Sequence, residues 1–253
     1  MMSAHRIAIA LTGVGLMVLA MAGCRAPGKP GPGPEVIRPE QVSDFATLYK
    51  ENCAACHGED GHHGNAVSLA NPVYLALAGK DVLWNATAKG GPGELMPAFA
   101  KSQGGTLTDQ QIGILVDGIR QRWARPGLLA GENPPPYAAA AKGDAATGQA
   151  DFQTYCARCH GVSAAAAPAG AKGSAIQTGP TIQAGPVTDP NFLALISDQS
   201  LRSTILAGRP DEGMPDWRGF AAQPLTDRQV TDIVAWLGSK RQSFSGPPGT
   251  KSP

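Results

Sequence analysis

The 253 residues carry 21 Lys and Arg against 20 Asp and Glu, and Arg6 is the only one of these charges before Cys24. The balance also holds locally, so composition excludes a nucleic-acid-binding function driven by charge. With 32 glycines and 22 prolines, the chain is predicted to form two small, loop-rich domains packed around something other than protein, and not one large core.

Segment 1–23 is predicted to be a secretion signal, because His5 and Arg6 precede an apolar stretch of about 16 residues. That length is short for a membrane span. The segment ends in Leu-Ala-Met-Ala-Gly before Cys24, which resembles a bacterial lipobox, so we expect cleavage before Cys24 and lipid attachment to it. The alternatives are an uncleaved anchor helix, or ordinary signal cleavage beside an unrelated cysteine. Segment 24–40, where prolines alternate with glycines, is predicted to be an extended, lipid-anchored tether.

Two copies of Cys-x-x-Cys-His are the motifs that carry chemistry in this chain. Covalent haem attachment requires this pentapeptide, because two thiols on one helical turn add to the haem vinyl groups and the next histidine meets the iron. Four of the five cysteines belong to these motifs and the fifth is Cys24, which leaves no thiol for a disulfide. We therefore expect two covalently bound haem c groups. The motif residues are Cys53, Cys56 and His57 in the first copy, and Cys156, Cys159 and His160 in the second.

A short amphipathic helix is predicted to run into each haem motif. A Thr-x-x-Gln capping box at Thr108, and another at Thr226, predicts the start of a last helix in each half. The apolar positions of these last helices recur at helical spacing, so we expect each to pack on the helix that precedes the haem motif of the same half. The residues that mark the preceding helices are Phe45, Leu48, Tyr49, Phe152 and Tyr155.

Downstream of the haem motifs the two halves align at a constant offset of 118 residues, which indicates a duplication. The motifs themselves are offset by 103, so the second half carries fifteen extra residues between His160 and Asp189. These are predicted to form a surface loop. The predicted domains are 41–125 and 143–242, joined by a Pro-rich linker, 126–142, and followed by a disordered tail, 243–253.

Each half also holds one methionine at a matched position, Met96 or Met214, followed in both cases by proline. The other four of the six methionines lie in the signal segment. A second ligand keeps the haem iron closed to other molecules, and a thioether sulfur favours Fe(II) and so raises the potential. Met96 and Met214 are therefore predicted to be iron ligands, and the alternative is that they fill the core.

Zinc binding and dithiol redox chemistry are the alternatives to haem at these cysteines and histidines. Two Cys-x-x-Cys pairs can form a zinc site, but here they lie far apart in separate repeats, and each is followed at once by histidine. A thioredoxin-like redox pair would need a βαβ pattern, which is missing. His62 and His63 lie between Gly61 and Gly64 and are predicted to occupy a solvated turn, and the alternative is that they bind an iron or another metal.

As a set, these motifs resemble class I cytochrome c, with Cys-x-x-Cys-His near the first helix and Met-Pro before the last. The resemblance covers 41–125 and 143–242 and implies an all-α fold of two tandem domains, each wrapped around one haem. It also implies that His57 and Met96 bind the first iron, and that His160 and Met214 bind the second.

In such domains the carbonyl of a proline often accepts the Nδ1–H of the iron-binding histidine. Gly179-Pro180-Thr181 matches that element in the second half, whereas the first half shows no clear counterpart before Asn71-Pro72.

The expected function is transfer of single electrons between membrane-associated redox proteins, outside the cytoplasm, by a periplasmic or otherwise extracytoplasmic lipoprotein. The alternative is a dihaem oxidoreductase of the peroxidase or thiosulfate dehydrogenase type, in which one haem opens a coordination site or carries an unusual ligand. A methionine for each iron and the lack of a spare cysteine favour the carrier over an enzyme. A cytochrome subunit of a larger dehydrogenase or respiratory complex would differ from a carrier in partner and not in chemistry.

Overall fold

The computed structural model describes residues 33, 37–91, 95–161 and 186–241. The predicted signal segment, Cys24, most of the tether, the Gly179-Pro180-Thr181 element and the C-terminal tail lie outside these residues. Two compact units are present, Met1–Gln41 and Val42–Pro253. In the first, the 3-10 helix η2 (Pro39–Gln41) is held by a hydrogen bond from the Arg38 N–H to the Gln41 Oε1, at 3.0 Å.

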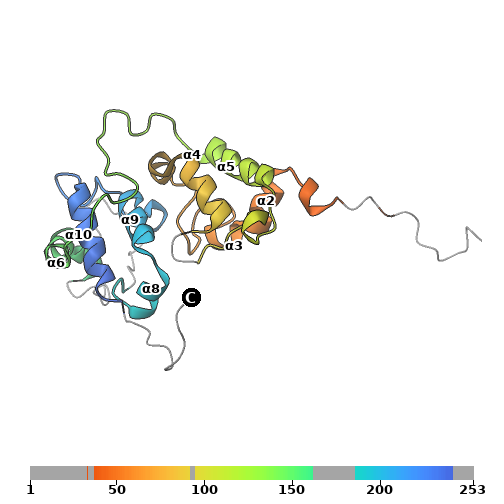
Figure 1. The fold of residues 1–253 in the computed structure, drawn as a ribbon. Coiled ribbons are helices and arrows are strands. Elements are labelled where there is room, and N and C mark those ends of the chain that lie inside the picture. Colours follow the sequence, from red (N-terminus) through yellow and green to blue (C-terminus); the bar gives the residue numbers. More distant parts are fainter. Residues whose placement is uncertain (1–32, 34–36, 92–94, 162–185, 242–253) are drawn as a thin grey trace, which may run out of the picture. The chain divides into compact units, whose positions relative to one another are not determined.

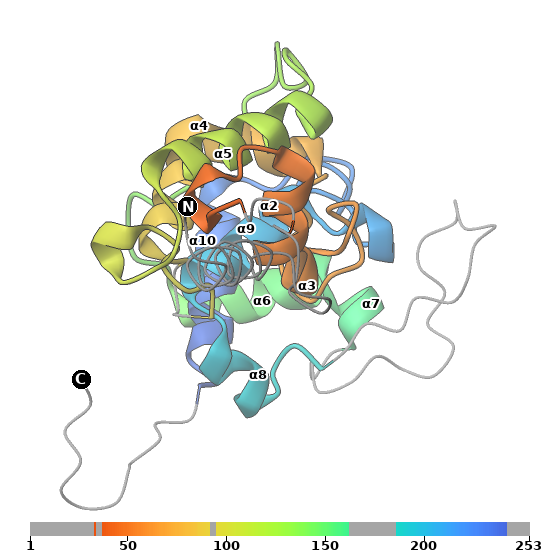
Figure 2. The same ribbon diagram turned by 90° about the vertical axis from the view of Figure 1, so that its right-hand side faces the viewer.

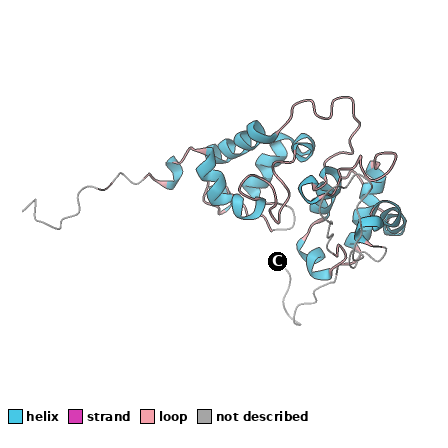
Figure 3. Cartoon of the chain, turned by 180° about the vertical axis from the view of Figure 1, so that it is seen from behind, coloured by secondary structure: helices cyan, strands magenta, loops and turns pink. Residues whose placement is uncertain are grey.

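The regular structure of the described residues is helical, as predicted for an all-α fold (Figure 3). Among these residues, β-type pairing is limited to two isolated bridges, Ala100 with Leu107 and Arg209 with Met214. No helix in this part of the chain has the length and apolar character needed to span a membrane. The helices of the second unit are α2 (Phe45–Asn52), α3 (Ala54–His57), α4 (Pro72–Lys89), η3 (Lys101–Gln103), α5 (Asp109–Trp123), α6 (Ala145–Tyr155), α7 (Ala157–His160), α8 (Pro190–Leu195), α9 (Asp198–Ala207), η4 (Pro210–Glu212) and α10 (Asp227–Gly238) (Figure 1).

The last helix of each half packs on the helix that precedes its haem motif, which confirms the predicted pairing. Helix α5 contacts α2 and α4, and α10 contacts α6 and α9 (Figure 2). Glycines permit the close approach: a Cβ at Gly118 of α5 would lie 2.0 Å from the ring of Phe45, and a Cβ at Gly148 of α6 would lie 1.8 Å from the Asp232 carbonyl oxygen. Where α6 packs on α10, the backbone at Gly148 lies directly against the backbone at Asp232, so there is no room for a side chain.

The internal repeat is visible in the helix starts. Both predicted capping boxes are present, with the Thr108 hydroxyl accepting from the Gln111 N–H at 3.2 Å and the Thr226 hydroxyl accepting from the Gln229 N–H at 3.3 Å. Asn71 and the matched Asp189 cap α4 and α8 in the same way, and each is followed by proline.

Helix α4 corresponds to two helices of the second half. It is interrupted at Gly79, whose φ of 69° is not helical. The matched residue is Ser197, which lies between α8 and α9 and caps α9. The same break in the chain is therefore made by a glycine in one copy and by a capping serine in the other.

The Pro-rich segment 126–142 is fastened to the second half by Arg202. The Arg202 side chain is only 2% exposed, and its Nε donates to the carbonyl oxygens of Pro136 and Tyr137, both at 3.1 Å. The rest of its guanidinium is bound by Asp227 and Thr231. This charged side chain can be buried because the five donors of its planar guanidinium satisfy carbonyls that a Pro-rich segment leaves free.

Substitution of Gly148 tests the close packing of α6 on α10. Gly148→Ala should lower the free energy of unfolding by about 1–3 kcal/mol, because the new methyl group overlaps the Asp232 carbonyl. In α5, a Cβ at Gly113 meets nothing within 4 Å, so Gly113→Ala should be neutral or stabilising by up to about 1 kcal/mol. Urea unfolding of the haem-loaded protein, followed by circular dichroism, measures both. Equal effects of the two substitutions would contradict this packing.

Candidate haem sites

Each haem motif occupies one helical turn with a sharp end. In the first half, Cys53 caps the end of α2, and α3 carries the remaining motif residues up to His57. The next residue, Gly58, has a φ of 84°, and Gly161 after the second motif has a φ of 76°. A Cβ at Gly58 would lie 1.7 Å from the His62 carbonyl oxygen, so only glycine allows the chain to reverse here.

The four motif cysteines are free thiols, and the first of each pair is buried. Burial raises the pKa of Cys53 and the pKa of Cys156 to about 12 each, so both thiols stay protonated at neutral pH. A thioether formed there would carry no charge and would suit the buried position. No disulfide competes with haem attachment at these four cysteines.

His57 is oriented as an iron-binding imidazole should be. Its side chain lies in the core at 7% exposure, and its Nδ1 lies 2.8 Å from the Val67 carbonyl oxygen. Because a carbonyl only accepts, Nδ1 carries the proton and Nε2 is left with its lone pair. Burial lowers the pKa of His57, which keeps the ring neutral and able to bind a metal.

Val67 therefore supplies the support that the sequence did not reveal in the first half. The resemblance pointed to a Gly-Pro element, and no such element precedes Asn71-Pro72. In the second half His160 is half-buried at the end of α7, with its ring 6.3 Å from that of Phe152. The Gly179-Pro180-Thr181 element expected to support it falls outside the described residues.

Met96 and Met214 lie on loops with matched backbone geometry. The Met96 carbonyl accepts from the Gly91 N–H at 2.9 Å, and the Met214 carbonyl accepts from the matched Arg209 N–H, also at 2.9 Å. Positive φ values at Gly90 and Gly208, of 93° and 67°, start both loops. Both methionines are half-buried. The same backbone hydrogen bond therefore holds each methionine next to the start of its segment, and residues 92–94 of the first segment lie outside the described residues.

The two additional histidines lie on the surface, as predicted for a turn. His62 and His63 are exposed, and the His62 Nδ1 lies 3.3 Å from the Ser68 hydroxyl. The His63 Nδ1 lies 3.4 Å from a Glu212 carboxylate oxygen of the second half. The turn is therefore solvated on one side and in contact with another part of the chain on the other.

The residues present fit a covalently bound haem. Free thiols spaced on one turn, an imidazole held through Nδ1 and a thioether on a fixed loop form the donor set that haem c requires. Arg209 adds a further feature, because its buried Nε has no hydrogen-bond acceptor among the described residues. A buried guanidinium donor of this kind suits a haem carboxylate.

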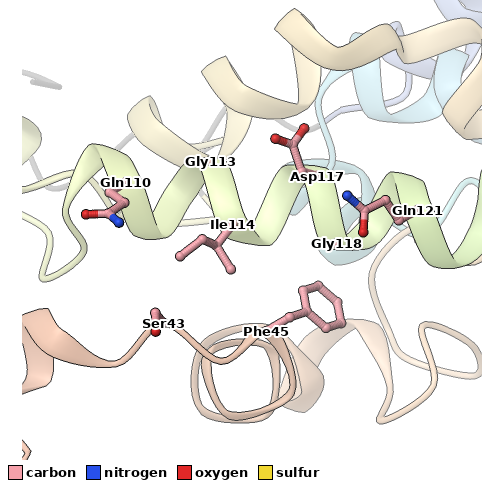
Figure 4. A pocket seen from close by; sticks show the side chains of 8 residues that line it. All are labelled: Ser43, Phe45, Gln110, Gly113, Ile114, Asp117, Gly118 and Gln121. Atoms are coloured by element: carbon pink, nitrogen blue, oxygen red, sulfur yellow. The ribbon is translucent and has the colours of Figure 1, made fainter.

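A separate hollow lies on the surface between α5 and the start of α2 (Figure 4). It is lined by Phe45, Ser43 and one face of α5, and Figure 4 shows the Asp117 and Gln121 side chains on the helix above Phe45. None of the eight lining residues belongs to a haem motif or to a methionine loop. This hollow is therefore distinct from the candidate haem sites.

Known proteins similar to this chain include one family, one named oxidase subunit and one solved structure. Residues 40–117 and 143–237 match the family described as cytochrome c oxidase, cbb3-type, subunit III. A cbb3-type cytochrome c oxidase subunit CcoP of Azospirillum sp. (strain B510) is 30% identical over 228 residues, which is 80% of this chain and 65% of that protein. A chain of the Kuenenia stuttgartiensis reducing HAO-like protein complex Kustc0457/Kustc0458 aligns with a TM-score of 0.43 and 17% identity, covering 83% of this chain and 99% of that one. The family match spans more than half of the chain, and on that basis this chain belongs to the c-type cytochromes of the cbb3 oxidase subunit III family.

Proposed function

We propose that this protein is a dihaem electron carrier, in which each half binds one haem c and passes single electrons. The observation that supports this most directly is the repetition of one complete donor set: a Cys-x-x-Cys-His turn closed by glycine, and a methionine on a backbone-closed loop. When bound, haem supplies a one-electron Fe(III)/Fe(II) couple. Two closed coordination shells favour electron transfer over ligand binding or turnover of a substrate, so we infer a carrier and not an enzyme.

The residues of the chain would have separate tasks in this function. Cys53, Cys56, Cys156 and Cys159 would hold the two haems covalently, and His57 and His160 would each bind one iron through the imidazole. Met96 and Met214 would each supply a second protein ligand, whose soft sulfur would favour the reduced metal. The Val67 carbonyl would fix the orientation of His57 through its Nδ1 proton. We propose domain boundaries of 41–125 and 143–242, joined by 126–142.

The partners are proposed from chemistry and from the named relative. That relative is a subunit of a cytochrome c oxidase, and this chain spans about 65% of its length. We propose that this protein works in a respiratory chain outside the cytoplasm, accepting electrons from one membrane-associated redox protein and passing them to another. Lipid on Cys24, followed by the tether 24–40, would hold it near both partners.

The haem content is the first prediction. The exported protein should carry two covalently bound haems, and the double substitution Cys156→Ala with Cys159→Ala should leave one, because the thiols of each motif attach a single haem. Intact-mass spectrometry after export from cells that mature c-type cytochromes counts the haems. The matched change of Cys53 and Cys56 should also leave one. An unmodified wild-type polypeptide would overturn the proposed function.

The second prediction concerns the methionine ligands. Met214→Ala should lower the potential of one haem, open it to carbon monoxide and remove about half of the methionine–iron charge-transfer absorbance of the oxidised protein. Met96→Ala should do the same for the other haem, so each single variant keeps one unchanged spectrum. Redox titration and optical spectra measure these effects. If either variant keeps both haems unaltered, the assignment of that methionine is wrong.

The third prediction concerns the lipid anchor. Wild-type protein should sediment with membranes, whereas Cys24→Ser should move nearly all of it to the soluble exported fraction, because no thiol remains for lipid attachment. The haem spectrum should not change, since Cys24 is not a haem cysteine. Fractionation with haem staining measures both. Membrane association that survives in Cys24→Ser would show that something other than the lipid anchors the chain.

A further inference from the structure

The two halves meet through a small set of polar contacts beside the candidate haem sites. One side is the attachment segment, residues 61–71, which follows the first haem motif. The other is the methionine segment, residues 207–214, which ends at Met214. Both belong to the compact unit Val42–Pro253, and helices α4 and α9 next to them are also in contact.

Arg209 is the central residue of this contact. Its backbone exchanges two hydrogen bonds with Met214, each at 2.9 Å, and its Nη2 donates to the Gly64 carbonyl oxygen of the first half at 2.9 Å. Gly64 in turn packs on the first haem motif, since a Cβ there would lie 2.2 Å from the Cys56 carbonyl oxygen. Arg209 therefore links the loop that carries one candidate iron ligand to the backbone of the other haem motif.

Asn71 makes a second connection of the same kind. It is 2% exposed, and its Oδ1 caps α4 while its Nδ2 donates to the carbonyl oxygens of Ala207 and Gly208, at 2.9 and 3.3 Å. Buried carbonyls need such donors, because an unpaired one costs about 1–3 kcal/mol.

Asp211 completes the contact between the attachment segment and the methionine segment. Its side chain is 4% exposed, and its Oδ2 accepts from the His63 backbone N–H at 3.0 Å. The same Oδ2 lies 3.8 Å from the Arg209 Nη2, so a positive charge already faces it. His63, Asp211 and Glu212 have their side-chain ligand atoms within 4.8 Å of one another. With Arg209 beside Asp211, we assign this cluster to the contact between the halves and not to a cation.

The repeat has diverged at the residues that make this contact. At the offset of 118 residues, Arg209 matches Gly91, and Asn71 matches Asp189. Gly91 has no side chain to reach another domain. Asp189 caps its helix as Asn71 does, but a carboxylate has no N–H to donate. Matched residues therefore make the same local hydrogen bonds in both halves. Only Asn71 and Arg209 have, in addition, a side-chain N–H that donates to the other half.

We propose that Arg209 and Asn71 are positioning residues that hold the two haem-binding halves at a fixed separation, so that an electron can pass between them within the molecule. The proposal rests on the proposed dihaem function. In this contact the methionine segment of the second half faces the attachment segment of the first half.

The test exchanges each residue for the one that the other copy carries. Arg209→Gly and Asn71→Asp should each raise amide hydrogen exchange in 61–71 and 207–214 about tenfold or more, because a buried cross-link between the halves is lost. Small-angle X-ray scattering of the double variant should show a larger radius of gyration. Electron transfer between the two haems after photoreduction should be slower in the variants with the larger radius of gyration.

Asp189→Asn is the matched control, because it makes the reverse exchange in a helix cap away from this contact and should change none of these measurements. Haem content and the methionine–iron absorbance are recorded for every variant, so that failure of the dihaem function is seen separately. Arg209→Met serves as a second variant should Arg209→Gly lose haem. Unchanged exchange and scattering with both haems bound would overturn the proposal, as would loosened halves with an unchanged interhaem rate.

Discussion

A single helical turn has to present two thiols and an imidazole and then stop, and in both halves a glycine with a positive φ ends it. At Gly58 the reversal is so tight that any side chain would overlap the His62 carbonyl. The reversal brings the Val67 carbonyl back to His57, and the Tyr49 hydroxyl donates to the Gly58 carbonyl oxygen at 2.9 Å. The packing of α2, whose Tyr49 also contacts Trp123 of α5, depends on that turn.

Much of the fold could be predicted because its signals are local. A capping box specifies a helix start within four residues, and apolar spacing specifies which face is buried, so the last helix of each half was predicted at Thr108 and Thr226 with its packing partner. The candidate haem residues are equally local, since a motif of five residues and a repeated Met-Pro pair identify them. The matched glycines at 90 and 208 both have a positive φ, and the residue after each donates to the carbonyl of the methionine that follows.

The features that sequence did not reveal depend on residues far apart in the chain. Every residue carries a carbonyl, so nothing in its side chain marks Val67 as the acceptor for His57. Arg202 resembles any surface arginine until the carbonyls of Pro136 and Tyr137 are placed against it. In both cases the partner is backbone, and backbone partners are set by tertiary structure, which periodicity does not encode.

The two halves differ at the residues that make the contact between them, and this difference affects how the halves can associate. A contact between two like domains that uses different patches on each is head-to-tail, and such contacts continue into open chains when every domain carries both patches. Here the donor on the methionine loop is present only at 209, and the donor in the helix cap only at 71. An arginine at 91 would crowd Met96, because even a Cβ there lies 2.9 Å from the Met96 Cβ. An amide at 189 alone would not create such a contact, because the first-half methionine segment carries Gly91 where the second half carries Arg209. With glycine at 91 and aspartate at 189, each half carries only one of the two donors, so the contact formed by Arg209 and Asn71 cannot be repeated with the roles of the halves exchanged.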